Sequence, residues 1–332
     1  MSEQGIPTPP PRPASEGGPR PWSVGLDIGG TKVLGVAVDG DGVVRHQVRL
    51  ATATGASALV DVVVAVVEDL AARVGVPVPE LAGVGIGLPG VVDAENGLVE
   101  HAVNLGIEQS TPLASLVAER LGVHVRVEND LTVAVVGAAH TVDGTQAADE
   151  PEVHDVAFLA LGTGLAAGLL LEGRLRRGAH GGAGEIGHLT LVPGGLPCKC
   201  GQLGCLEQYA SGSALDIAWP SRFGRPAPAE LFAAAADGDP EAVEVRDRFA
   251  WAVASAVRIL VLTADVDLVV IGGGVSALGQ PLLRAVRGEL ERQAQSSPFL
   301  ASMGLAARVS LAPADVPVGA VGAALLGRGE YF

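Results

Sequence analysis

All three cysteines of the chain lie close together, at Cys198, Cys200 and Cys205, and His188 precedes them. Zinc prefers four thiolate or imidazole ligands in a tetrahedron, and the glycines among these cysteines permit the tight turns that such a site needs. The alternative is three unrelated buried thiols and a surface histidine. Because the whole cysteine supply is gathered among glycines, we expect these four residues to bind one structural zinc ion that organises a substrate pocket.

A second group of chemically capable residues lies at positions 27–32, where a carboxylate, a glycine turn, a hydroxyl and an ammonium follow one another. Glycines let backbone N–H groups approach phosphate oxygens, Thr31 can donate a hydrogen bond, and Asp27 can hold magnesium directly or through water. An ordinary hairpin turn would give the same pattern. A similar segment at 161–164 and the glycine cluster at 272–274, where adenine could rest against exposed backbone, favour nucleotide binding.

Two segments, 85–90 and 162–167, satisfy the glycine fingerprint of dinucleotide-binding proteins. That fingerprint requires a helix to begin at its second glycine. Pro89 contradicts a helix in the first segment, and the apolar return at 168–171 contradicts one in the second. The sequence therefore disfavours a dehydrogenase.

Glu128, Asn129 and Asp130 follow a buried strand and precede the helical stretch 131–140. Asp130 would then lie near a helix N-terminus, which favours its ionised form. An ionised aspartate beside a bound hydroxyl can act as general base, and phosphoryl transfer to an alcohol needs such a group. A plain helix cap is the alternative. The neighbouring motifs favour the catalytic interpretation.

The elements that must position these groups alternate between strand and helix, which indicates an α/β fold in which two halves open with similar hairpins. The 332 residues, 48% of them apolar, are enough for two domains. Residues 1–22 are rich in proline, glycine and serine and are expected to form a disordered tail. We expect strands at 24–28, 33–38, 81–86, 123–127, 156–161, 168–171 and 268–271, helices at 57–73, 111–122, 131–140 and 243–263, and loops at 141–154 and 219–240.

The net charge of −15 disfavours nucleic-acid binding through a broad basic surface, so small molecules are the expected partners. The apolar runs are shorter than the roughly 20 residues of a membrane span, and we expect no membrane partner. No apolar signal-peptide core is evident, and clustered thiols suit a reducing compartment. We therefore expect a cytoplasmic protein.

These motifs together resemble the ROK family of sugar kinases and repressors, and the match covers nearly the whole chain from Val24 onward. Its most specific parts are residues 27–32, 128–130, 161–168, 178–188 and 198–207. The resemblance implies two actin-like (ribonuclease H-like) ATPase domains that flank a cleft for sugar and ATP. We expect residues 23–128, completed by a C-terminal helix at 317–330, to form the first domain, and residues 129–316, with the zinc loop 188–207, to form the second.

The resemblance also implies roles for single residues, with Asp130 as catalytic base. His188 would bind zinc through one ring nitrogen and face a sugar hydroxyl with the other. The implied cofactors are ATP, Mg²⁺ and structural Zn²⁺, and relatives suggest a homodimer or homotetramer. The sugar-binding set is Gly90, Asn104, Asn129, Asp130, Glu185, His188 and Glu207. The nucleotide-binding set is Asp27, Gly29, Gly30, Thr31, Lys32, Thr163, Gly164, Gly273 and Gly274.

The sequence departs from the usual family pattern in three places. Leu131 and Thr132 follow the expected base where alanine and asparagine are common, Ala166 and Ala167 stand where glycine is common, and Lys199 separates two cysteines. These changes remove a polar group near the base, add two methyl groups expected near the phosphates and add a cation beside the metal loop. They leave sugar choice and turnover rate open.

The expected function is ATP-dependent phosphorylation of a hexose, with glucose and its 6-hydroxyl first. Kinases of fructose, N-acetylglucosamine and N-acetylmannosamine share these pocket residues, and polyphosphate is an alternative donor. A non-catalytic sugar sensor would have no use for Asp130. A repressor would need a DNA-reading helix-turn-helix ahead of Val24. The residues that precede Val24 are proline-rich, so we expect no such domain there.

Overall fold

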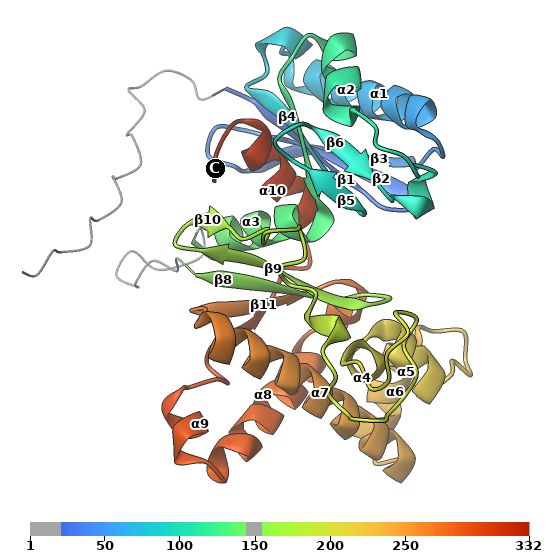
Figure 1. The fold of residues 1–332 in the computed structure, drawn as a ribbon, viewed down its shortest axis with the longest axis vertical. Helices are drawn as coiled ribbons and strands as arrows, with labels where there is room; N and C mark the ends of the chain where they lie inside the picture. Colours follow the sequence, from blue (N-terminus) through green and yellow to red (C-terminus); the bar gives the residue numbers. More distant parts are fainter. Residues whose placement is uncertain (1–20, 144–154, 332) are drawn as a thin grey trace, which may run out of the picture.

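The protein, as seen in a computed structural model that describes residues 21–143 and 155–331, is built around two five-stranded sheets (Figure 1). The predicted tail at 1–22 and loop at 141–154 fall largely outside the described residues. At the end of the predicted tail, Trp22 packs against the core of the first sheet, and its carbonyl accepts the Ala82 N–H at 2.8 Å. Trp22 is therefore part of the fold rather than of a tail.

The two sheets have the same strand plan, which confirms the predicted pair of hairpins. Each starts with three antiparallel strands and continues with two parallel ones, in the orders β3-β2-β1-β4-β7 and β10-β9-β8-β11-β12. The first sheet consists of β1 (Ser23–Ile28), β2 (Lys32–Val38), β3 (Val44–Ala51), β4 (Gly83–Leu88) and β7 (Val125–Asn129). The second consists of β8 (Val156–Leu161), β9 (Leu165–Leu171), β10 (Arg174–Leu175), β11 (Leu268–Gly272) and β12 (Val309–Leu311), and a small ribbon pairs β5 (Val91–Asp93) with β6 (Leu98–Glu100).

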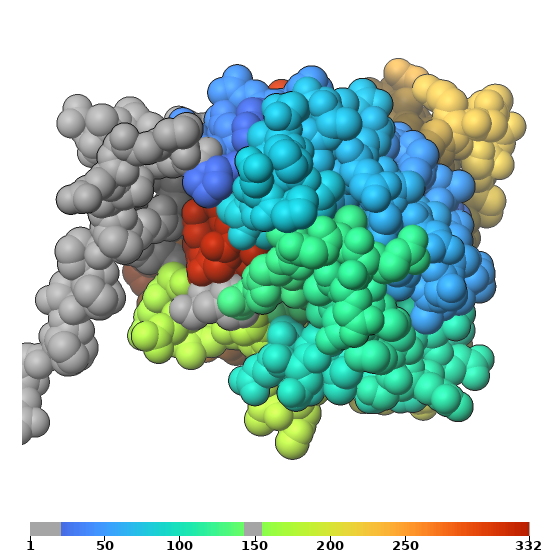
Figure 2. All heavy atoms as spheres, turned by 90° about the horizontal axis from the view of Figure 1, so that it is seen from above, coloured from blue at the N-terminus to red at the C-terminus, as the bar shows by residue number. Residues whose placement is uncertain are grey.

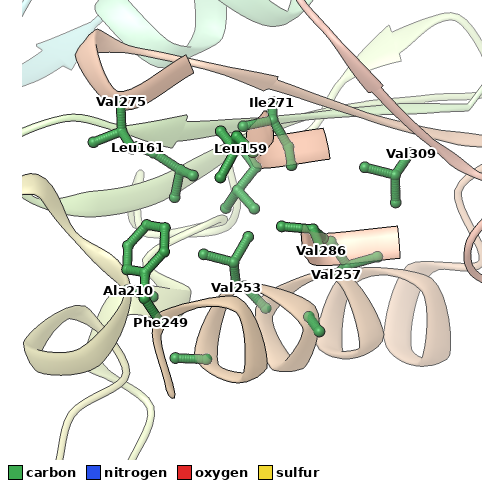
Figure 3. Close-up of a cluster of buried hydrophobic side chains, with 14 of the residues drawn as sticks. Leu159, Leu161, Ala210, Phe249, Val253, Val257, Ile271, Val275, Val286 and Val309 are labelled. Carbon is green, nitrogen blue, oxygen red and sulfur yellow. The ribbon is translucent and has the colours of Figure 1, made fainter. Parts of the chain in front are cut away.

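Helices cover the outer face of each sheet. The apolar faces of α1 (Ala56–Val74) and α2 (Leu113–Leu121) pack on the first sheet, and α7 (Pro240–Ala264) and α8 (Gln280–Gln295) pack on the second. Figure 3 shows Phe249 and Val253 of α7 in the same buried cluster as strand residues such as Leu159. The short elements are η1 (Val78–Glu80), η2 (Val103–Leu105), η3 (Ile186–His188), η4 (Gly274–Leu278), α4 (Glu207–Ala210), α5 (Gly212–Ala218), α6 (Ala227–Ala236) and α9 (Pro298–Ser302).

Two helices, α3 (Asp130–Asp143) and α10 (Val318–Gly327), pack against each other between the sheets. The C-terminal segment is visible in red between the blue first sheet and the yellow-green region near β10 in Figure 2. Glycines make this close packing possible. A Cβ on Gly322 would lie 1.8 Å from the Val133 carbonyl oxygen, and one on Gly85 would lie 1.8 Å from the Ala323 carbonyl oxygen. A glycine of the first fingerprint-like segment thus serves helix packing, and no helix begins there.

The predicted elements are present, with differences at their ends and in one loop. The segment at 219–240 was expected to be a loop, but α6 lies within it because Leu231 and Phe232 are buried in the second core. Helix α1 begins one residue before the expected start at 57, and Gly55 stands at its N-cap without a side-chain hydrogen bond. In the described ranges 21–143 and 155–331, no helix has the length and apolar character needed to cross a membrane.

Candidate active site

Both glycine hairpins form tight turns whose side chains a ligand can reach. In the first, the Gly29 N–H donates to the Lys32 carbonyl at 2.9 Å, and the Thr52 hydroxyl donates to the Gly29 carbonyl at 2.7 Å. In the second, the Gly162 N–H donates to the Gly164 carbonyl at 3.1 Å. The side chains of Thr31, Lys32 and Thr163 are exposed on these turns.

The third glycine cluster lies beside the second hairpin. Gly273 has φ +84°, and a Cβ there would lie 2.5 Å from the Leu161 carbonyl oxygen, so only glycine fits. A Cβ on Gly274 would meet nothing within 4 Å, which leaves an open face next to the hairpin. The structure therefore brings together four predicted nucleotide-binding residues: Thr163, Gly164, Gly273 and Gly274.

The predicted sugar-binding residues of the first half lie against the first hairpin and the end of β7. Asn129 Nδ2 donates to the Gly90 carbonyl at 3.4 Å. A Cβ on Gly30 would lie 3.3 Å from the Cβ of Asn104, which places Asn104 beside the first hairpin. Gly90 has φ +123°, and a Cβ there would lie 2.9 Å from the Glu100 carbonyl oxygen. A glycine is therefore required at this position.

Asp130 is the first residue of α3, as the sequence predicted. The Leu131 N–H donates to Asp130 Oδ1 at 3.0 Å, yet burial raises the pKa of Asp130 and the negative charge of Glu185 raises it further. The N–H contacts at the helix start lower the pKa, as expected, but desolvation outweighs them and the net shift is upward. A carboxylate with a raised pKa is a stronger base toward a hydroxyl.

Asp27 stands next to Asp130 at the end of β1. Burial and the charge of Asp130 raise the pKa of Asp27 to about 6, against the opposing effect of Lys32. A Cβ on Gly319 would lie 3.0 Å from Asp27 Oδ2, so the carboxylate is close to the start of α10. Two neighbouring half-buried carboxyl groups favour a bound cation, and carboxylate oxygens are the ligands that Mg²⁺ prefers. Asp27 thus fits the predicted magnesium role.

The three cysteines and His188 converge as predicted. Their four ligand atoms lie within 4.8 Å of one another, with 3.7 Å from Cys198 Sγ to His188 Nδ1 and 3.7 Å from Cys200 Sγ to Cys205 Sγ. Tetrahedral zinc with bonds of about 2.0–2.3 Å separates its ligand atoms by roughly 3.5–3.8 Å, whereas a disulfide needs about 2.05 Å. These two pairs of ligand atoms therefore have the spacing of a tetrahedral zinc site.

The surroundings of two of these thiols shift their pKa in opposite directions. The backbone and side-chain N–H groups of Gln202 lower the pKa of Cys200 to about 6, while burial raises the pKa of Cys205 to about 12. Zinc would stabilise both as thiolates. Gly201 and Gly204 have φ +92° and +79°, which confirms the predicted glycine turns around the cysteines.

His188 and Glu207 connect the cysteine cluster to the rest of the site. His188 Nδ1 faces Cys198, and its Nε2 lies 4.0 Å from Glu185 Oε2, so the two ring nitrogens point to different partners. Glu207 Oε2 accepts the Leu165 N–H at 3.0 Å, in the second glycine hairpin. The loop that carries the cysteines is thus tied to residues of both the predicted sugar-binding set and the predicted nucleotide-binding set.

Two features of the site escaped the sequence analysis. Ala167 was expected to place a methyl group near phosphates, but it is 2% exposed and packs in the second core. Arg177 was not singled out, yet it forms an ion pair with the buried Glu128 next to Asn129 and Asp130. No local pattern marks this pair, because its members are far apart in the sequence.

Two sheets of one topology, a pair of glycine hairpins and a carboxylate pair at the strand ends define a two-domain actin-like ATPase fold. The chain belongs to the ROK family, whose sequence model matches residues 23–330. It is 35% identical over 289 residues to a glucokinase of Streptomyces coelicolor, covering 81% of this chain and 87% of that protein. Its identity to an N-acetyl-D-glucosamine kinase of Vibrio cholerae is 33% over 264 residues, covering 76% of this chain and 84% of that protein.

Among solved structures, the chain is similar to a ROK family glucokinase from Streptomyces griseus in complex with glucose and AMPPNP. The two share 32% identity with a TM-score of 0.72, and the alignment covers 92% of this chain and 99% of that one. The similarity therefore extends over both sheets.

Proposed function

We propose that the protein is an ATP-dependent hexose kinase that transfers the γ-phosphoryl group of ATP to the 6-hydroxyl of glucose. The observation that carries the proposal is the position of Asp130. This half-buried carboxylate with a raised pKa stands beside Asn129 and within the field of Glu185, both in the predicted sugar-binding set, and it interacts with Asp27. The similarity to glucokinases supports glucose as the acceptor.

In this mechanism Asn129, Glu185 and His188 bind and orient the sugar through its hydroxyls. Asp130 accepts the proton of the attacking hydroxyl while that oxygen forms a bond to the γ-phosphorus and the bond to the β-phosphate oxygen breaks. The N–H contact from Leu131 holds the Asp130 carboxylate in place. Burial of Asp130 limits competition from water for the same proton.

The proposed cofactors follow from the donor atoms. Asp27 would hold Mg²⁺, which supplies charge neutralisation to the phosphates when bound. His188, Cys198, Cys200 and Cys205 would hold a structural Zn²⁺, which fixes the ring of His188 for the sugar.

The proposal is tested by ADP production from magnesium-ATP against glucose, fructose, mannose, N-acetylglucosamine and N-acetylmannosamine. We expect turnover with glucose well above the others. A parallel assay with polyphosphate as donor separates the two donors. Absence of turnover with every sugar, while glucose binding and zinc remain detectable, would refute the kinase and favour a non-catalytic sensor.

A second candidate is phosphorylation of N-acetylglucosamine, which the similarity to the kinase from Vibrio cholerae supports. The same base and hairpins would serve it, since the two sugars differ only at position 2. Preferential turnover of N-acetylglucosamine in the same assay would establish this alternative and keep the mechanism.

We further propose that residues 23–128 together with 317–330 form one domain and that residues 129–316 form the other. The packing of α10 on β1 and β4 supports this division.

A homodimer or homotetramer is supported by exposed apolar side chains beside the cysteine loop, such as Leu196 and Ile217, which are 50% and 77% exposed. Sedimentation analysis tests this assembly. The free thiols support a cytoplasmic location.

A further inference from the structure

An ion pair joins the edges of the two sheets next to the proposed base. Glu128 lies near the end of β7, the edge strand of the first sheet, and Arg177 follows β10, the edge strand of the second. Arg177 Nε lies 2.6 Å and Nη2 2.5 Å from Glu128 Oε2. Glu128 is 4% exposed, whereas the Arg177 side chain is 33% exposed, so the ion pair is buried on the carboxylate side only.

The other oxygen of Glu128 holds the backbone that carries the site. Glu128 Oε1 accepts the Asn129 N–H at 3.0 Å, while Asn129 donates its side chain to the Gly90 carbonyl at 3.4 Å. Both carboxylate oxygens are thus used, one for Arg177 and one for the strand end. Movement of Glu128 would displace Asn129 and, one residue further, Asp130.

The other partner of the ion pair begins the loop that carries Glu185 and His188. The Arg177 carbonyl accepts the Ala183 N–H at 3.2 Å, which closes this loop, and the Gly184 carbonyl accepts the Ala167 N–H at 2.8 Å from β9. Arg177 is therefore at one end of a loop whose other end leads directly into Glu185.

We propose, on the basis of the function proposed above, that the Arg177–Glu128 ion pair is a latch that positions the two parts of the sugar site relative to each other. One part is the strand end with Asn129 and Asp130, and the other is the loop end with Glu185 and His188. Arg177 is a positioning residue. The ion pair suits this role, because loss of Arg177 takes this partner away from the buried Glu128 carboxylate and allows the carboxylate to move.

The test is equilibrium binding of glucose without nucleotide, measured by calorimetry for the wild type, Arg177→Gln, Glu128→Gln and the double variant. Misplacement of binding groups by about 1 Å costs up to roughly 100-fold, so we expect each single variant to bind glucose about 10- to 100-fold more weakly. Because both changes break the same ion pair, their effects should not multiply. We expect the double variant to bind glucose at most about threefold more weakly than either single variant. Binding of a non-hydrolysable ATP analogue should stay unchanged.

A matched control is Arg73→Gln, which removes an exposed ion pair with Asp69, with N–O distances of 2.9 Å on α1, and should leave glucose affinity unchanged. If Arg177→Gln does not fold, Arg177→Lys carries the test, because a single ammonium can keep the charge but not both contacts. We expect this variant to bind glucose about three- to tenfold more weakly than the wild type.

The latch would be overturned by wild-type glucose affinity in a folded Arg177→Gln or Arg177→Lys variant. It would also be overturned if the losses of glucose affinity in the two single variants multiplied in the double variant. The kinase proposal fails separately, through absence of turnover in the wild type. Should the wild type prefer another sugar of the panel, that sugar replaces glucose in the binding experiment.

Discussion

A methyl group added at Gly164 should weaken sugar binding by displacing Glu207. A Cβ at this position would lie 2.5 Å from Glu207 Oε2, whereas ordinary contacts begin at 3.4 Å. The carboxylate must therefore move by roughly 1 Å to restore a normal contact distance. Such a shift disrupts the hydrogen bond from the Leu165 N–H, now 3.0 Å long, and moves the group that we assign to the sugar.

The size of the effect follows from the energy of hydrogen bonds to charged groups, which is about 1.5–3 kcal/mol. Since about 1.4 kcal/mol corresponds to a tenfold change in affinity, Gly164→Ala should weaken glucose binding about 10- to 100-fold. The variant should still fold, because the displaced group is the end of a flexible side chain.

Calorimetric titration with glucose, without nucleotide, measures this effect. Gly162→Ala is the matched control in the same turn, since a Cβ there would meet nothing within 4 Å, and neither glycine has a positive φ. We expect Gly162→Ala to bind glucose as the wild type does. Equal glucose affinity of Gly164→Ala and Gly162→Ala would refute the assignment of Glu207 to the sugar.

Two further predictions concern Asp27 and the cysteine cluster. The pKa of Asp27 is raised from 3.8 to about 6, so its protonated form favours the folded state at low pH and this contribution is lost as the pH rises through 6. Without magnesium, Asp27→Asn should therefore be more stable than the wild type at pH 8, and this difference in stability should shrink toward pH 5. Thermal melting at several pH values measures it. A stability difference that does not change with pH would contradict the burial of this charge. Elemental analysis should find one zinc per chain of the wild type. The Cys205→Ser variant should lose the metal, melt at a lower temperature and bind glucose more weakly. Full metal content and unchanged glucose binding in this variant would exclude an organising role for the zinc ion.

The sequence predicted well those parts of the fold that depend on residues close to one another in the chain. The hairpins of β1–β2 and β8–β9 follow from apolar strands around glycine turns, and the repeated pattern indicated two similar halves. The helix α6 was missed because proline and acidic residues around it resemble a loop, while burial of Leu231 against distant elements decides its structure.

The candidate site divides in the same way. The cysteine cluster and Asp130 were found because spacing and neighbours within a short segment point to their chemistry. The raised pKa of Asp130 was not predictable, since burial by other parts of the chain outweighs the local helix start. The ion pair of Arg177 and Glu128 was equally invisible, because only the arrangement of the two sheets brings these residues together.

The central claim is that Asp130 accepts a proton from a sugar hydroxyl during phosphoryl transfer from ATP. Its most direct test compares the wild type with Asp130→Asn in two measurements, glucose binding and formation of glucose 6-phosphate from magnesium-ATP. Asparagine can still donate and accept hydrogen bonds but cannot accept the proton, so we expect binding within a few-fold of wild type and turnover reduced by about 10²- to 10⁴-fold. Near-normal turnover of Asp130→Asn would contradict the account.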